Sequence, residues 1–222
     1  MNAYLTINTV PELACLLLAV VFLGRDKDPF WRMLILYLFL TCMVELAGIY
    51  IHKVLQRSNM PLYTVFVLFE CFAVSSFFFA LLRPYGLKRR WLAAWLAVFI
   101  LTYFAELLAG HFHHFVSVTT SLMSVAFVLA ALCYYYLLLN ADKFERLTLH
   151  AAFWWTNGSF IFYFGGTVCN LFFDILIAHP ASVYTHSIRY IIFGVSDVIL
   201  YTCWSLSFLC RYLQRRSTPS SA

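Results

Sequence analysis

Seven apolar stretches divide the chain, and each is long enough to form a helix that crosses a lipid bilayer. They cover residues 5–23, 31–51, 61–82, 91–110, 115–139, 153–178 and 188–210. A membrane-spanning helix needs about 20 predominantly apolar residues. Charged and turn-forming residues separate the stretches, and such residues end helices. The pattern predicts an all-α bundle of seven transmembrane helices in one domain over residues 1–210, followed by a short basic tail over residues 211–222.

The composition supports a membrane protein over a water-soluble one. Hydrophobic residues make up 63% of the chain and charged residues only 11%, which is too little charge to cover a soluble domain of 222 residues. The net charge of +5 sits in short loops, so it is a topology signal and not a nucleic-acid-binding surface. All seven cysteines fall in apolar stretches without a CxxC pair, so we expect them to be small buried hydrophobes. The expected partner is the lipid bilayer, with the chain multi-pass in the cell membrane, or the inner membrane if the source is bacterial.

Basic residues are biased toward one side of the predicted membrane. Twelve of the 15 lysines and arginines follow the first, third, fifth and seventh stretches, and only Lys53, Arg57 and Arg189 lie on the other side. Short loops rich in Lys and Arg stay in the cytoplasm. The bias predicts a cytoplasmic C-terminus, and seven spans then put the N-terminus outside. Because residues 1–10 contain no Lys or Arg, we expect no cleavable signal peptide.

Most acidic residues fall inside the apolar stretches and not in loops. These six are Glu12, Glu45, Glu70, Glu106, Asp174 and Asp197. A carboxylate at mid-bilayer costs at least about 2.5–3.5 kcal/mol, so each should face the bundle interior. In the predicted orientation all six lie near the middle or in the outer half of the membrane. The three cations on that side cannot pair with six carboxylates, so some acids should be protonated, hydrogen-bonded to Tyr or His, or bound to a cation.

Polar and small residues recur every three or four positions in four stretches, so each set shares one helix face. The sets are Tyr37, Thr41, Glu45, Gly48 and His52; Trp95, Thr102, Glu106 and His113; Ser159, Tyr163, Gly166, Asn170 and Asp174; and Tyr190, Gly194, Asp197, Tyr201 and Ser205. Helix packing alone explains many Ser and Thr residues in membranes. It explains the acids less well, so the stripes predict a polar cavity that opens outward. The candidate ligand-binding or proton-relay residues are Glu45, Glu70, Glu106, Asn170, Asp174, Asp197 and Tyr201.

Glu45, Glu70 and Asp197 lie furthest from the ends of their predicted helices. They have the largest desolvation cost if charged, so we expect at least one to be protonated at neutral pH or neutralised by a bound cation. We also predict that the three converge in space. Glu70 is the least supported member, because only Tyr63 shares its line while Cys71 and Ser75 do not.

Several cofactors have no residues to hold them, and we expect none. A retinal Schiff base needs a helix lysine, but Lys27, Lys53, Lys88 and Lys143 are all in loops. Membrane haem needs facing histidines inside helices, and the histidines here lie at helix ends. The nearest approach to a metal site is the group His111, His113 and His114, which lacks an HExxH pattern. We therefore predict no tightly bound transition metal.

Two segments, residues 61–70 (PLYTVFVLFE) and 153–163 (FWWTNGSFIFY), suggest a family resemblance. With the seven-helix layout, they resemble small uncharacterised bacterial seven-helix proteins and the seven-helix N-terminal sensor region of some histidine kinases. The resemblance implies sensing of an external or membrane-accessible ligand of unknown identity. No kinase domain follows Arg216, so a separate signalling partner protein is expected. Two alternatives stay open: an intramembrane enzyme that uses carboxylates as acid and base on lipid or prenyl substrates, and a small proton-coupled transporter.

Overall fold

The computed structural model describes residues 8–110, 115–140, 147–171 and 188–217, and all regular structure in these ranges is helical. The helices are α1 (Thr9–Leu23), α2 (Pro29–Lys53), α3 (Met60–Leu82), α4 (Arg89–Ala109), α5 (Ser117–Leu139), α6 (Ala151–Leu171) and α8 (Ile188–Ser217). Two short 3-10 turns, η1 (Arg83–Tyr85) and η2 (Leu147–Leu149), precede α4 and α6. The prediction of an all-α chain is confirmed, and each predicted stretch overlaps one of these helices.

Five helices are long and apolar enough to cross a membrane: α2, α3, α4, α5 and α8. The described part of α1 has 15 residues, which at 1.5 Å per residue falls short of a hydrocarbon core of about 30 Å. Helix α6 has 21 residues but includes a run of polar and small residues at Thr156–Ser159, and it packs between α5 and α8. Residues 5–7 and 172–178 of the predicted spans lie outside the described residues. The several long apolar helices indicate a membrane-embedded protein, and the count of seven spans stays a prediction.

Local sequence signals set the helix boundaries. Asp28 caps α2 by accepting a hydrogen bond from the Phe30 amide at 3.0 Å, and Pro29 takes the first helical position. Pro61 occupies the equivalent first turn of α3. After η1 the chain turns at Gly86, whose φ of 94° is a left-handed conformation that glycine adopts without a steric penalty.

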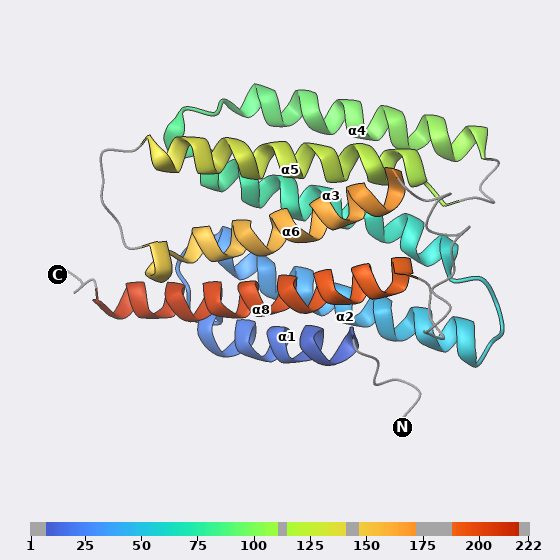
Figure 1. The fold of residues 1–222 in the computed structure, drawn as a ribbon, viewed down its shortest axis with the longest axis horizontal. Coiled ribbons are helices and arrows are strands. Elements are labelled where there is room, and N and C mark those ends of the chain that lie inside the picture. The colour runs from blue at the N-terminus through green and yellow to red at the C-terminus, as the bar shows by residue number, and fades with distance from the viewer. Residues whose placement is uncertain (1–7, 111–114, 141–146, 172–187, 218–222) are drawn as a thin grey trace.

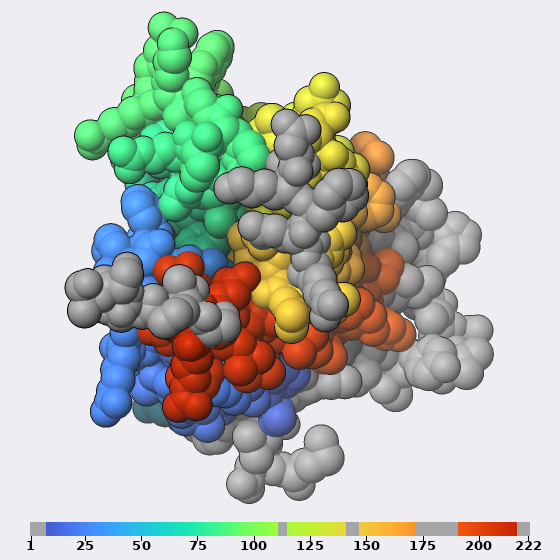
Figure 2. Space-filling view, turned by 90° about the vertical axis from the view of Figure 1, so that its left-hand side faces the viewer, coloured from blue at the N-terminus to red at the C-terminus, as the bar shows by residue number. Residues whose placement is uncertain are grey.

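Six of the seven described α-helices close into a ring, and α4 lies outside it. Successive contacts run α1–α2–α3–α5–α6–α8 and return from α8 to α1. The helices alternate in direction, so the ends of α1, α3, α5 and α8 gather at one end of the bundle (Figure 1). Among the described helices α4 packs mainly against α3 and α5, and it stands at the side of the bundle in the end-on view (Figure 2). The interior is therefore built mainly by the six helices of the ring, and α4 adds the buried Phe99 and Tyr103 to the same hydrophobic core.

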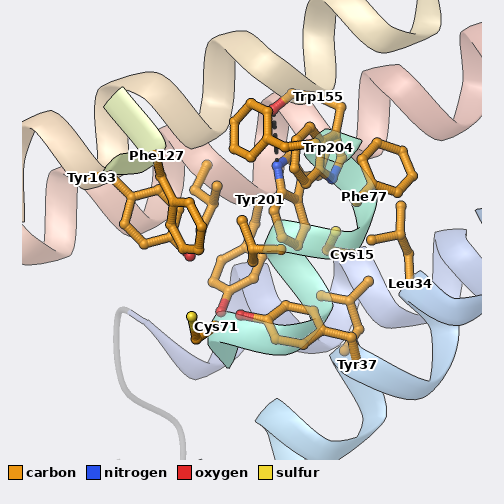
Figure 3. Packing of buried hydrophobic residues seen from close by; sticks show 14 of the residues in the cluster. Cys15, Leu34, Tyr37, Cys71, Phe77, Phe127, Trp155, Tyr163, Tyr201 and Trp204 are labelled. Carbon is orange, nitrogen blue, oxygen red and sulfur yellow. Dashed lines mark hydrogen bonds between the residues drawn. The ribbon is translucent and has the colours of Figure 1, made fainter. Parts of the chain in front are cut away.

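Large aromatic side chains fill the interior toward the end where the described part of α8 finishes. Trp155 and Trp204 stack with their ring centroids 5.5 Å apart, and Phe77 lies 4.2 Å from Trp155 (Figure 3). Trp31 meets the other side of Phe77 at 5.0 Å. All four side chains are buried, so this half of the ring interior is packed solid. We call these four residues the aromatic plug.

Helices α6 and α8 approach closely because small residues line their contact. The Trp204 indole donates to the Trp155 carbonyl and to Ser159 Oγ, both at 3.2 Å, and Ser207 donates to the Ala151 carbonyl at 2.7 Å. A β-carbon at Gly158 would lie 2.8 Å from the Cys203 β-carbon, closer than such atoms pack. Glycine at this position is therefore what lets the two backbones meet.

An ion-pair cluster joins the α1–α2 loop to the last turns of α8. Arg211 Nε donates to Asp26 Oδ2 at 2.9 Å, and the nearest Arg215 nitrogen lies 3.4 Å from the same oxygen. The Asp26 side chain is 1% exposed. Burial alone raises the pKa of Asp26, but the hydrogen bonds from Arg211 and from the Asp28 amide, together with the charges of Arg211 and Arg215, leave that pKa below its usual value. The cluster fixes the ring closure between α1 and α8.

A carboxylate-lined cavity at one end of the bundle

A cavity of about 420 Å³ lies between the helices at one end of the bundle. The aromatic plug and the ion-pair cluster lie toward the other end. We call it the acidic cavity, because four carboxylates line it: Glu12 from α1, Glu45 from α2, Glu70 from α3 and Asp197 from α8. Asn8, Met60 and Phe115, which flank helix starts, line its outer part, and Tyr37 and Tyr201 line its inner part. The predicted convergence of Glu45, Glu70 and Asp197 is therefore confirmed.

The shared depth of these acids follows from the helix positions. Glu45 is eight residues before the end of α2, Glu70 is ten after the start of α3, and Asp197 is nine after the start of α8. At 1.5 Å per residue all three lie roughly 12–15 Å below the same end of the bundle. Glu12 is only three residues into α1, so it lies nearer that end.

Two of the carboxylates are held by tyrosines. The Tyr63 hydroxyl donates to Glu45 Oε2 at 2.8 Å, and the Tyr163 hydroxyl donates to Glu70 Oε1 at 2.8 Å. Tyr63 reaches Glu45 because Gly48, one turn further along α2, leaves room for its ring; a β-carbon there would lie 2.6 Å from the hydroxyl. These bonds tie α2 to α3 and α3 to α6 around the cavity.

The other two carboxylates are less satisfied. Glu12 is 3% exposed, pairs with the Cys42 thiol, a weak donor, and leaves Oε1 without a hydrogen-bond partner among the described residues. Asp197 accepts no hydrogen bond from any described side chain and lies within electrostatic range of Glu45 and Glu70. No Lys, Arg or His belongs to the described lining. Among the described residues, the site therefore concentrates negative charge without a matching protein cation.

A second cavity adjoins the first along the Glu70–Tyr163 pair. The described residues that line it come from α3, α5, α6 and α8 and include Asn170, Ser121 and Ser124. Asn170 Nδ2 donates to Ser121 Oγ at 3.0 Å, which links α6 to α5. The candidate residue Asn170 thus belongs to the neighbouring cavity, whereas Tyr201 lies at the inner part of the acidic cavity itself.

The structure corrects the expectation for Glu106 and its helix. Glu106 is absent from the described lining of both cavities, and it accepts hydrogen bonds from the Val118 amide at 2.9 Å and from the Thr119 amide and hydroxyl at 2.7 Å. It therefore satisfies the free amides at the start of α5. Of the described stripe residues of α4, Trp95 donates to the buried Ser75 of α3 at 2.9 Å, whereas Thr102 and Glu106 do not line the acidic cavity.

Some candidates cannot be placed. Asp174 and the group His111, His113 and His114 lie outside the described residues. Within the described part of the chain, no three His, Cys, Asp or Glu side chains are arranged to hold a metal ion. All seven cysteines are free thiols, and only Cys133 is exposed.

Comparisons with models of known protein families, with functionally characterised proteins and with solved structures find no match for this chain. The class that the fold and the site define is a helical bundle of membrane-protein type with an acidic cavity at one end. Its function has to be argued from that cavity.

Sequence reasoning left two groups out of the candidate site. The sequence identifies Glu12 as an acid inside an apolar stretch, but it belongs to none of the four polar stripes and is not among the predicted site residues. Tyr37 and Tyr163 belong to predicted polar stripes and Tyr63 lies on the line of Glu70, and all three line the acidic cavity without being predicted site residues. The signal available in the sequence was their spacing: Tyr37 precedes Glu45 by eight residues and Tyr63 precedes Glu70 by seven, which puts each pair on one helix face.

Proposed function

We propose that this chain is an outward-facing, multi-pass membrane protein of receptor or sensor type that binds a small ligand in the acidic cavity. The observation that carries the proposal is the cavity itself, a concave space of about 420 Å³ that gathers four carboxylates and several aromatic side chains from five helices. Ligand sites are typically concave, largely apolar, and furnished with a few converging polar groups.

The aromatic plug supports a receptor over a transporter. Transport needs a path that can open to both sides of the bilayer, with polar groups along it. Here Trp155, Trp204 and Phe77 fill the ring interior beyond Tyr201, and the Asp26–Arg211 pair closes the helix ends behind them. Because the cavity ends at packed aromatic rings, a ligand can enter and leave it from one side of the membrane only, as in a receptor.

The proposed topology has seven spans, with the N-terminus outside and the C-terminus in the cytoplasm. Support comes from the distribution of Lys and Arg over the chain, and from the gathering of the ends of α1, α3, α5 and α8 at one end of the bundle (Figure 1). In this orientation the acidic cavity faces the exterior. Fusion of a reporter to the C-terminus should give activity only for a reporter that works in the cytoplasm, and activity of a reporter restricted to the exterior would contradict the proposed topology.

The resemblance to the sensor regions of histidine kinases favours a signalling role. We propose that a ligand-induced change reaches a separate partner protein at the cytoplasmic end, where the ion-pair cluster of Asp26, Arg211 and Arg215 joins α1 to α8.

Cysteine accessibility tests whether the cavity faces outward. Thr41 lines the acidic cavity. In a Cys133→Ser background, a Thr41→Cys variant in intact cells should react with a small membrane-impermeant methanethiosulfonate reagent added outside. The matched control is Ser207→Cys, at a fully buried position on the plugged side, which should react only after unfolding. The Cys133→Ser parent, which still contains the native Cys42 next to Thr41, gives the background rate of modification to be subtracted.

The same variant separates the functional classes. A compound that slows modification of Thr41→Cys is a ligand, and a receptor should release it unchanged and should not accumulate it in proteoliposomes. Accumulation would overturn the proposal in favour of transport, and chemical conversion would overturn it in favour of an enzyme. Modification only from the cytoplasmic side would refute the outward-facing cavity.

A further inference from the structure

The described residues give the acidic cavity a single sign of charge, and this restricts what can bind there. Its described lining holds four carboxylates and no Lys, Arg or His. Carboxylates removed from water need protons or a cation to neutralise them. Glu45 and Glu70 each accept a tyrosine hydroxyl, whereas Asp197 accepts no hydrogen bond from a described side chain. Glu12 also lines the cavity, and its buried Oε1 has no hydrogen-bond partner among the described residues. A ligand with positive charge and hydrogen-bond donors would satisfy both.

Aromatic side chains form about half of the remaining described wall of the cavity. Eight of its described lining residues are Phe or Tyr: Tyr37, Tyr63, Phe66, Phe115, Phe162, Tyr163, Phe193 and Tyr201. Aromatic faces attract cations through the ring quadrupole, and cages of such rings are used to bind quaternary ammonium groups. Apolar rings also suit the carbon substituents of an organic ion, which a hydrated metal ion lacks.

The placement of the acids argues against a bare metal ion. A metal site needs three or more ligands converging on one point, and the described residues form no such group. The four acids come from four different helices around a space of about 420 Å³. A space of this size suits a larger ion that carries carbon substituents.

Building on the proposed function, we propose that the ligand of the acidic cavity is a small organic ammonium ion. Asp197 and Glu12 supply the counter-charge, and the faces of the surrounding Phe and Tyr rings contact its carbon substituents. The Tyr63–Glu45 and Tyr163–Glu70 hydrogen bonds position these rings and carboxylates at the wall.

Choline and its uncharged isostere 3,3-dimethyl-1-butanol test the proposal, because they differ in charge and hardly in shape. With the Thr41→Cys variant, saturating choline should slow methanethiosulfonate modification by about tenfold or more, which corresponds to ~1.4 kcal/mol. The isostere should leave the rate unchanged. Tetraethylammonium and putrescine extend the test to larger and to doubly charged ions.

Substitutions at the acids assign the counter-charge. Asp197→Asn and Glu12→Gln should each raise the choline concentration needed for half-protection by about tenfold. The matched control is Glu106→Gln, which changes an acid of α4 outside the cavity and should leave that concentration unchanged. A further measurement needs no acid substitution: a cationic methanethiosulfonate should modify Thr41→Cys faster than an anionic one of similar size.

The outcomes separate this inference from the function on which it rests. If no reagent modifies Thr41→Cys, the accessible cavity is wrong and the proposed function fails. If Thr41→Cys reacts at equal rates with the cationic and anionic reagents, and none of the three ammonium compounds protects it, the cavity stands and the ammonium ligand is refuted. Equal protection by choline and its isostere would likewise overturn the role of charge.

Discussion

Replacing Gly158 with alanine should loosen the contact between α6 and α8. A β-carbon at this position would lie 2.8 Å from the Cys203 β-carbon, 3.0 Å from the Leu200 carbonyl oxygen and 3.2 Å from Trp204 Cδ1. Two of these atoms belong to the backbone or are fixed directly to it, so a rotamer change cannot relieve the clash. The helices must move apart, which also lengthens the bonds from Trp204 to α6.

The size of the effect follows from two opposing terms. Overpacking of a well-filled interior costs about 1–3 kcal/mol. Alanine in place of glycine inside a helix stabilises the folded state by about 0.5–1 kcal/mol, because the unfolded chain has less conformational entropy to lose. We therefore expect Gly158→Ala to lower the free energy of unfolding by about 1 kcal/mol, within a range of roughly 0–2.5 kcal/mol set by the two terms.

Gly166, two turns further along α6, provides the matched control. A β-carbon there would have its nearest neighbours at 3.8 Å and 3.9 Å, which is ordinary van der Waals contact. Gly166→Ala should therefore be neutral or stabilise by up to about 0.5–1 kcal/mol.

Equilibrium unfolding of both variants in mild detergent, followed by tryptophan fluorescence, measures the difference. The Trp155–Trp204 stack lies beside Gly158, so its emission should also change in the Gly158→Ala variant before unfolding. Equal stabilities for Gly158→Ala and Gly166→Ala would refute the close approach of α6 and α8 at Gly158.

Two further predictions concern the ends of the bundle. Asp26→Asn should destabilise the protein by about 1–3 kcal/mol, because it leaves the partly exposed Arg211 without its buried partner. Unfolding in detergent measures this, and an unchanged stability would contradict the stabilising role of the ion-pair cluster. Since the folded pKa of Asp26 lies below its unfolded value, its stabilisation should be present above about pH 4 and disappear as the pH falls through the folded pKa, and the Asp26→Asn variant should lack this pH dependence. Glu106→Ala should lower the free energy of unfolding by about 1 kcal/mol, because the amides at the start of α5 lose their acceptor. Glu106→Gln should be milder, since it keeps an acceptor oxygen. Faster hydrogen exchange at Val118 and Thr119 would report the loss, and unchanged exchange would contradict the capping role of Glu106.

The helices and the depth of the acids could be predicted from the sequence, because both depend on local pattern. Long apolar runs with charged breaks define a helix without knowledge of its neighbours, and the position of Glu70 or Asp197 along its run fixes its depth. Spacing also identifies which residues share a helix face. It does not identify which faces meet, since that depends on contacts between distant segments.

Helix α4 and Glu12 illustrate this limit. The stripe of α4 resembles those of α2 and α8, yet Thr102 bonds to its own backbone at Val98 and Glu106 caps α5, so both are satisfied without reaching the interior. Glu12 enters the cavity only because α1 closes the ring against α8. Periodicity within either helix carries no information on these long-range contacts.

The closure of the ring between α1 and α8 has a consequence for biosynthesis. Asp26 and Arg211 are separated by 185 residues, so at a synthesis rate of about 5–20 residues per second the first waits roughly 10–40 s for the second. During that interval α1 has α2 beside it but not α8, and the carboxylate of Glu12 faces an incomplete wall. The nascent chain must therefore remain in a protected environment at the membrane until its last helix arrives, and the acidic cavity is completed in the final step of assembly.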